Sequence, residues 1–276
     1  MHTQTTVAGG DGLALNVMEW GRRDGPAIVF IHGWSQATLC WQKQYDSSLA
    51  EHFRLIAFDL RGHGMSAAPT DPACYQQARL WAADLRAVLR GLSVESAVLV
   101  GWSYGSFVIG DYLNAYGAAG IAGINLVGGA VRFGEQALGA YIGAGFSETF
   151  PRAISRDLTV SIDAMREFIN RCFMIKMSRE DYERVLCFNM TARPDVRAAM
   201  VMRDDIDMDA ALRAWRGPLL LSHGRKDTMT LPSCAELARE LCPQAHISWY
   251  DDAAHGPFFE APEKFNQELA AFVRAI

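Results

Sequence analysis

The chain has 276 residues, of which 50% are hydrophobic and 21% are charged, and its formal net charge is −5. This length suits one large α/β domain, alone or with a small insertion, and the composition is typical of a soluble globular protein. The acidic balance, without a lysine and arginine stripe, argues against nucleic acid as a partner. No apolar stretch approaches the roughly 20 residues of a membrane span, and the N-terminus shows no signal peptide, so we expect a cytoplasmic protein without a membrane partner.

Six cysteines are spaced irregularly, and no two of them form a C-x-x-C pair. A zinc site is therefore not expected, and the cysteines are interpreted as small buried side chains in a reducing compartment. We expect neither a metal ion nor another cofactor.

Short apolar runs alternate with helical segments along the chain. Eight runs are typical of strands: Thr5–Val7, Leu13–Trp20, Ala27–Ile31, Leu55–Phe58, Ala97–Val100, Ile121–Val127, Leu219–Leu221 and Ile247–Tyr250. The first two flank a glycine-rich turn, which is a hairpin signal. Helical stretches separate the other six, and this order predicts an α/β fold with a mostly parallel sheet and helices on both faces.

Apolar residues at a helical period predict the main helices. One spans 75–92, another runs from about 104 to 116 and ends at Gly117, and a third begins near Pro262. Between about Arg132 and Asp209 we find helical patterns and no strong strand signal. We therefore expect a core domain of residues 1–131 and 210–276, with a helical cap of residues 132–209 inserted above the carboxyl ends of the strands, where such sheets bind ligands.

Ser103 lies in Gly101-Trp102-Ser103-Tyr104-Gly105, directly after the apolar run that ends at Val100. A strand that passes through G-x-S-x-G into a helix predicts a sharp turn that presents the serine hydroxyl. Side chains at 101 and 105 would clash where the helix passes the strand, which explains both glycines. The motif is weak by itself, so the assignment depends on a base and an acid at the same edge of the sheet.

His255 is the best-placed base among the seven histidines, because a short loop joins it to the last predicted strand. It therefore lies at the carboxyl edge of the sheet, as Ser103 does. Asp227 follows the strand before that one and is our candidate for the acid that orients the imidazole. Asp251 and Asp252 are rival acids; they are nearer to His255 in sequence, but at a strand end where an exposed turn is the default.

An oxyanion pocket is expected where His32-Gly33-Trp34 follows a buried strand. Gly33 lets the backbone bend so that the Trp34 N–H points inward, and the Tyr104 N–H at a helix start is the second donor. The imidazole of His32 is interpreted as structural.

Together these segments resemble α/β-hydrolase-fold serine hydrolases over nearly the whole chain apart from the insertion. The matching segments are His32-Gly33-Trp34, Asp59–Ser66, Gly101–Gly105, Gly224–Asp227 and Ala254-His255-Gly256. The resemblance implies an eight-stranded α/β-hydrolase fold with Ser103 as nucleophile, Asp227 as acid and His255 as base. It also implies that 59–66 is a structural loop and that about 132–209 is the cap.

Within this family, the His32-Gly33-Trp34 start is similar to the cofactor-free esterases and perhydrolases historically called non-heme haloperoxidases. Gly105-Ser106 stands where those proteins usually have two glycines, and the cap looks different, so the resemblance leaves the substrate of this chain open. A serine at 103 argues against haloalkane dehalogenases and epoxide hydrolases, which use aspartate there. Hydrolases that cleave carbon–carbon bonds in aromatic ring-cleavage products usually have a longer glycine-rich oxyanion loop than the His32-Gly33-Trp34 segment of this sequence.

Aromatic residues near Ser103 and in the insertion predict a mostly apolar pocket for an acyl or alkoxy group of modest size. The candidate lining residues are Trp34, Trp102, Phe133, Phe146, Phe168 and Phe173. The phenylalanines in the insertion also recur at helical spacing. Packing in the hydrophobic core would therefore explain any one of them without a role in the pocket.

The sequence thus predicts a serine hydrolase that cleaves a small to medium carboxylic ester or lactone through an acyl-enzyme. The first alternative is a carbon–carbon bond hydrolase or perhydrolase with the same triad. The second is a ligand-binding or sensor protein with a vestigial triad, since fold does not fix function. The expected partner is a small ester-type substrate, and a homo-oligomer is compatible with the sequence.

Overall fold

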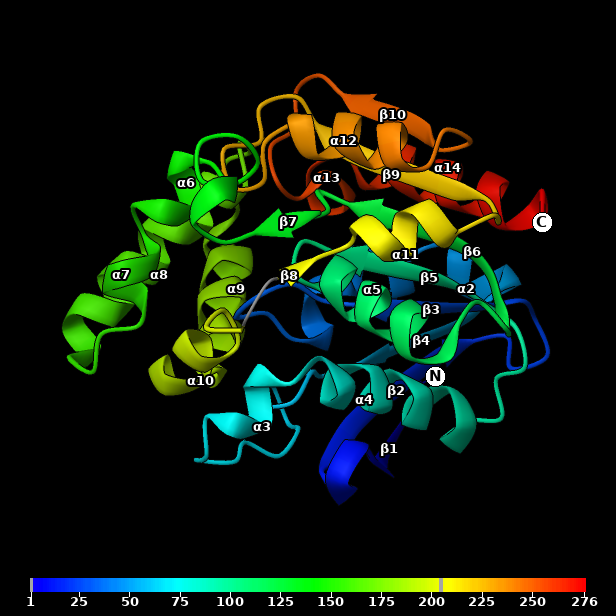
Figure 1. Ribbon diagram of the computed structural model, residues 1–276, viewed down its shortest axis with the longest axis horizontal. Coiled ribbons are helices and arrows are strands. Elements are labelled where there is room, and N and C mark those ends of the chain that lie inside the picture. The colour runs from blue at the N-terminus through cyan, green and yellow to red at the C-terminus, as the bar shows by residue number, and fades with distance from the viewer. Residues whose placement is uncertain (1, 204–205) are drawn as a thin grey trace.

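A computed structural model describes residues 2–203 and 206–276, and its centre is an eight-stranded sheet with the strand order β1-β2-β4-β3-β5-β6-β9-β10 (Figure 1). The strands are β1 (His2–Ala8), β2 (Ala14–Gly21), β3 (Ala27–Ile31), β4 (Arg54–Phe58), β5 (Ala97–Trp102), β6 (Ile121–Val127), β9 (Leu219–Gly224) and β10 (His246–Tyr250). Met1, Asp204 and Asp205, which the sequence assigns to the core and the cap, lie outside the described residues.

Strand β2 pairs antiparallel with both β1 and β4, and every other pair in this sheet is parallel. All residues of β3, β4, β5 and β9 are buried, as a strand covered on both faces requires. The predicted mostly parallel eight-stranded sheet is confirmed.

Helices cover both faces of this sheet. In Figure 1 the front layer contains α4 (Ala78–Gly91), α5 (Gly105–Tyr116), α11 (Asp209–Ala214) and α12 (Ser233–Leu241). Behind the sheet in this view lie α2 (Leu49–His52), α13 (Pro257–Glu260) and α14 (Pro262–Arg274). The short elements η2 (Thr38–Trp41) and α1 (Gln42–Tyr45) contact α13. Local chemistry sets the ends of these helices, because Gly117 follows α5 at a φ of 71° and Pro262 begins α14.

The predicted helix over 75–92 is divided in two. Short α3 (Ala73–Gln76) is followed by Gln77, whose extended backbone (φ −102°, ψ 116°) separates it from α4. The predicted turn between the first two strands contains a 3₁₀ turn, η1 (Gly10–Gly12), in which Asp11 has a φ of 57°.

Most of the chain between β6 and α11 forms a helical layer at one end of the molecule, on the left in Figure 1. Its elements are η3 (Glu135–Ala137), α6 (Ala144–Ser147), α7 (Phe150–Ala153), α8 (Leu158–Cys172), α9 (Arg179–Thr191) and α10 (Pro194–Ala199). Helix α9 begins after Ser178, whose hydroxyl accepts a hydrogen bond from the Asp181 N–H at 3.0 Å.

Two short strands close the base of this inserted segment, which the sequence expectation of purely helical structure missed. Strand β7 (Arg132–Phe133) pairs antiparallel with β8 (Ile206–Asp207) and brings the two ends of the segment together. Two-residue strands are too short to leave a periodic signal. The assignment of residues 132–209 to a separate cap domain stays a prediction.

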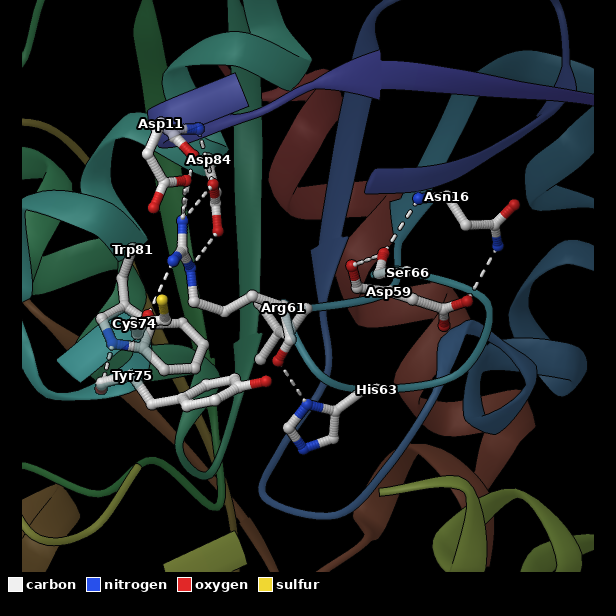
Figure 2. Close-up of polar contacts among 12 residues, drawn as sticks. Asp11, Asn16, Asp59, Arg61, His63, Ser66, Cys74, Tyr75, Trp81 and Asp84 are labelled. Atoms are coloured by element: carbon white, nitrogen blue, oxygen red, sulfur yellow. Dashed lines mark hydrogen bonds and ion pairs between the residues drawn. The ribbon is translucent and has the colours of Figure 1, made fainter. Parts of the chain in front are cut away.

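The loop after β4 is built from buried polar contacts (Figure 2). The Asp59 carboxylate accepts hydrogen bonds from the Thr38 N–H at 2.7 Å, the Asn16 amide at 2.8 Å and the Met65 N–H at 2.9 Å. Arg61 forms a two-pronged ion pair with Asp84 on α4, at 2.7 and 2.9 Å. These contacts join the loop to strand β2 and helix α4, which supports the structural role that the resemblance implies for it.

Within the described residues, every helix is either too short or too polar to cross a lipid bilayer.

Candidate active site

Ser103 occupies a strained turn between β5 and α5. Its φ is 53°, in the left-handed region, and its N–H donates to the Val127 carbonyl at 3.0 Å. A Cβ atom on Gly105 would lie 2.3 Å from the Ile31 oxygen, and one on Gly101 would lie 2.9 Å from the Gly105 oxygen. The steric reason that the sequence suggests for both glycines is confirmed.

His255 and Asp227 form a buried pair at the carboxyl ends of β10 and β9. The His255 Nδ1 lies 2.8 Å from Asp227 Oδ2, and each residue is only 3% exposed. The other carboxylate oxygen, Oδ1, accepts backbone N–H bonds from Met229 at 2.8 Å and Thr230 at 3.1 Å. These bonds fix the carboxylate, and the carboxylate in turn sets the imidazole tautomer with its proton on Nδ1.

The rival acids lie on the surface. Asp251 pairs with Arg225 and Asp252 with Lys226, each at 2.8 Å, and both aspartates are exposed. Asp227 is therefore the acid that contacts His255 directly.

Thr230 is a polar neighbour of this pair that sequence reasoning missed. Its Oγ1 lies 2.7 Å from the Gly128 carbonyl, 3.1 Å from Asp227 Oδ2 and 3.3 Å from His255 Nδ1. A hydroxyl three residues after the candidate acid, in the same loop, was the available signal.

Ser103 and His255 line one small cavity of about 30 Å³, which is room for only a few water-sized molecules. Among the described residues no hydrogen bond joins the Ser103 hydroxyl to the His255 ring. Such bonds are often long before substrate binds, so this geometry is compatible with a nucleophile and its base.

Four of the six predicted pocket residues line this cavity: Trp34, Phe133, Phe146 and Phe168. Its lining also includes residues that the sequence analysis did not select for the pocket: Tyr104, Phe107, Ala130, Ile142, Val201, Met229 and Thr230. Several of them follow strand ends at the same edge of the sheet, which was the signal that could have found them.

Trp102 and Phe173 lie outside the lining of the cavity. Trp102 still belongs to β5, and its ring packs against Phe258 at 4.8 Å on the face of the sheet away from α5. Phe173 packs against Phe259 at the same centroid distance, 4.8 Å. Trp102 does contribute to the site, because its Nε1 donates to the His255 carbonyl at 2.9 Å.

The loop after β3 passes directly beside the candidate nucleophile. A Cβ atom on Gly33 would lie 3.1 Å from the Ser103 Cβ. Within the described chain, the backbone N–H groups of Trp34 and Tyr104 have no hydrogen-bond acceptor. Two unbonded donors beside a strained serine fit the expected oxyanion pocket.

The buried rings of His32 and His63 form hydrogen bonds with the backbone of this loop. The His32 Nδ1 donates to the Gly33 carbonyl at 2.8 Å and its Nε2 accepts from the Leu60 N–H at 3.0 Å. Burial lowers the pKa of His32 to about 4, so its ring is neutral. These contacts agree with a structural role for His32.

Across the residues described, no cluster of histidine, cysteine, aspartate or glutamate side chains is arranged to hold a metal ion.

Comparison with known proteins identifies the family. A sequence model described as the alpha/beta hydrolase family matches residues 28–268. The chain belongs to the α/β hydrolase family. It is a hydrolase of the esterase type, since esterases recur among its relatives and structural neighbours.

Two solved structures are similar over nearly the whole chain. The esterase RhEst1 from Rhodococcus sp. ECU1013 is 35% identical, with a TM-score of 0.92 over 98% of each chain. A Burkholderia cenocepacia protein is also 35% identical, with a TM-score of 0.93 over 99% of this chain and 98% of the other. The non-heme chloroperoxidase of Streptomyces lividans is 26% identical over 98% of this chain and 99% of that protein.

Proposed function

We propose that the protein is a serine hydrolase that cleaves small to medium carboxylic esters or lactones through an acyl-enzyme. The observation that carries this proposal is the 2.8 Å contact between His255 Nδ1 and Asp227 Oδ2, in an imidazole that lines the same cavity as Ser103. Ser103 is the nucleophile, His255 the base and Asp227 the acid that orients it.

In the proposed reaction, His255 Nε2 takes the Ser103 proton while Oγ attacks the carbonyl carbon. The negative oxygen of the tetrahedral intermediate accepts hydrogen bonds from the N–H groups of Trp34 and Tyr104. His255 then gives its proton to the leaving alkoxide, and the acyl group stays on Ser103. Water, deprotonated by His255, repeats the attack, and the acid is released.

The lining of the cavity supports a compact, apolar acyl or alkoxy group. Phe133, Phe146 and Phe168 come from the inserted segment, and all three face the cavity that contains Ser103. In this proposal residues 132–209 act as a cap that covers the reacting carbonyl and excludes water from it.

Ser103→Ala tests the nucleophile. We expect turnover of p-nitrophenyl butyrate to fall by at least about 10³-fold, because no other group can form the acyl-enzyme. Ser106→Ala is the matched control, since this buried serine stands three residues along the same segment, and it should keep its activity. Full activity in the Ser103 variant would exclude the proposal.

A fluorophosphonate followed by mass spectrometry tests the same assignment without a choice of substrate. The wild-type protein should carry one adduct on Ser103, and Ser103→Ala none. A wild-type protein that remains unlabelled would favour the ligand-binding alternative.

Similarity to a bifunctional esterase/perhydrolase of Acinetobacter calcoaceticus, 38% identical over 38% of this chain and 37% of that protein, favours perhydrolysis as a second candidate. Here hydrogen peroxide replaces water as the group that opens the acyl-enzyme, so the same triad produces a peracid. Rates with acetate plus peroxide, with simple esters and with a ring-cleavage diketone, measured side by side, separate this candidate and the carbon–carbon hydrolase from the esterase.

A further inference from the structure

Arg197, on α10, is a fully buried cation without a carboxylate partner in the described part of the chain. Its exposed fraction is 0%, and burial lowers the pKa of its guanidinium to about 10, so the group remains charged at neutral pH. A buried charge with no counterion is costly unless hydrogen bonds satisfy it. The hydrogen bonds of the Arg197 guanidinium therefore show which segments this buried charge holds together.

The guanidinium joins three helices of the inserted segment to the loop after β3. Nη1 donates to the Ala153 carbonyl at 2.9 Å and to Ser161 Oγ at 3.0 Å, while Nη2 donates to the Asn189 carbonyl at 2.9 Å. Nε donates to Ser35 Oγ at 2.9 Å. Only the planar fork of arginine has enough donors to reach all four acceptors at once.

Both residues 34 and 35 are bonded to Arg197. The Trp34 indole Nε1 donates to the Arg197 carbonyl at 2.9 Å, in addition to the contact at Ser35 Oγ. Ser35 has a φ of 62°, a conformation that a serine adopts only when its surroundings impose it. Its N–H donates to His63 Nε2 at 3.2 Å and its hydroxyl donates to the Asn189 carbonyl at 2.9 Å.

We propose that Arg197 is a positioning residue that holds Trp34 and Ser35 in place, so that the Trp34 N–H faces the oxyanion formed on Ser103. The inference rests on the proposed function, in which Trp34 supplies one of the two oxyanion donors. Arg197 bonds the side chains of Trp34 and Ser35, the two residues that directly follow the Gly33–Trp34 peptide, and within the described chain the N–H of that peptide has no acceptor.

The test uses Arg197→Lys and Ser35→Ala. Lysine keeps a cation but cannot reach the four acceptors, and Ser35→Ala removes the acceptor of the Nε bond together with the hydroxyl donor to the Asn189 carbonyl. For p-nitrophenyl butyrate we expect kcat to fall about 10- to 100-fold in both variants, because a displaced donor stabilises the transition state poorly. KM should stay within about twofold, since the donor acts mainly in the transition state.

A transition-state analogue provides the second measurement. Butylboronic acid forms a tetrahedral adduct on an active serine, so its affinity should fall by the same factor as kcat. Arg193→Lys is the matched control. Arg193 precedes the same helix and donates to the Ala68 and Pro69 carbonyls at 3.0 and 3.1 Å, away from residues 34 and 35. This variant should keep the wild-type kcat and boronate affinity.

The outcomes separate this inference from the proposed function. Folded Arg197→Lys and Ser35→Ala variants with wild-type kcat and boronate affinity would overturn the role of Arg197, as would a rise in KM at unchanged kcat. If Arg197→Lys unfolds at a much lower temperature, the kcat and boronate affinity of Ser35→Ala alone decide whether the role of Arg197 stands. Loss of the proposed function would instead appear in the wild-type protein, as the absence of a fluorophosphonate adduct on Ser103.

Discussion

Gly105 shows how closely single residues are constrained around the candidate nucleophile. Helix α5 begins at this residue and passes so near β3 that an added methyl group would lie 2.3 Å from a backbone oxygen. Backbone cannot move aside as a flexible side chain can. The glycine at position 105 of the G-x-S-x-G motif is therefore required for packing, in addition to the chemical role proposed for Ser103.

Gly105→Ala should therefore lower the free energy of unfolding by about 3 kcal/mol or more. Gly110→Ala, later in the same helix, is the control. Its methyl group would meet only the flexible Met208 side chain at 3.2 Å, and alanine favours the helix, so the change should stay within about 1 kcal/mol. Urea unfolding of both variants provides the measurement, and equal losses would contradict the steric account.

At this scale the sequence predicts only part of the candidate site. Ser103, Asp227 and His255 could be selected because each follows a strand, and parallel strands end at one edge of a sheet. Arg197 could not, because its contact with Trp34 joins residues 163 positions apart, and no local pattern records it. Trp102 was misplaced because proximity to Ser103 in sequence does not say on which face of the sheet a ring lies.

At the scale of elements, the Arg61–Asp84 ion pair connects the loop after β4 with helix α4 (Figure 2). Both side chains are 0% exposed, and Asp84 Oδ1 also accepts a hydrogen bond from the Gly10 N–H at 2.8 Å. One carboxylate thus joins three segments that are distant in sequence. Asp11 contacts the same guanidinium at 3.5 Å from a half-exposed position and can compensate only in part.

Asp84→Asn should destabilise the protein by about 3–5 kcal/mol, because it leaves the Arg61 charge buried without its main partner. Glu183→Gln provides the comparison. Glu183 pairs with Arg179 on α9, where both side chains are exposed, and such pairs contribute little. Thermal melting should show a large loss for the first variant and no change for the second; similar melting temperatures would argue against the buried pair as a major contact.

The order of strands and helices along the chain was easier to predict than the contacts between side chains, because apolar runs and helical periodicity leave strong signals in the sequence. All eight strands of the main sheet were expected, within a few residues at their ends. The β7–β8 pair was not expected, since two residues carry no period. The break at Gln77 was also missed, because neither glycine nor proline marks it in the sequence.

At the scale of the whole molecule, neutral buried histidines couple stability to pH. The pKa of His32 is lowered to about 4 and that of His63 to about 3, in both cases chiefly by burial. Each ring accepts a backbone N–H at Nε2, and protonation would replace this acceptor with a donor. An unfolded chain returns both pKa values to about 6.5.

Because the folded pKa values lie below the unfolded ones, the unfolded state takes up protons first as the pH falls. The contribution to stability is complete above about pH 6.5 and is lost as the pH falls toward 4 for His32 and 3 for His63. Each histidine should cost about 1.4 kcal/mol per pH unit inside this window. Urea unfolding at pH 7, 6 and 5 should show the decline.

His63→Gln isolates one of the two contributions, since an amide oxygen can accept the Ser35 N–H without titrating. The slope of stability against pH should become shallower in this variant. His246→Gln, at an exposed position, should keep the wild-type slope. An unchanged slope in His63→Gln would refute the coupling.

The cavity at Ser103 takes its walls from two regions of the chain. Trp34 and Tyr104 belong to the segments around the sheet, and Phe146 and Phe168 belong to the inserted segment. Replacement of residues in the insertion can therefore alter the size and shape of the group that fits, while the three residues of the proposed triad stay the same. New specificities can evolve at this site without a change in its reaction.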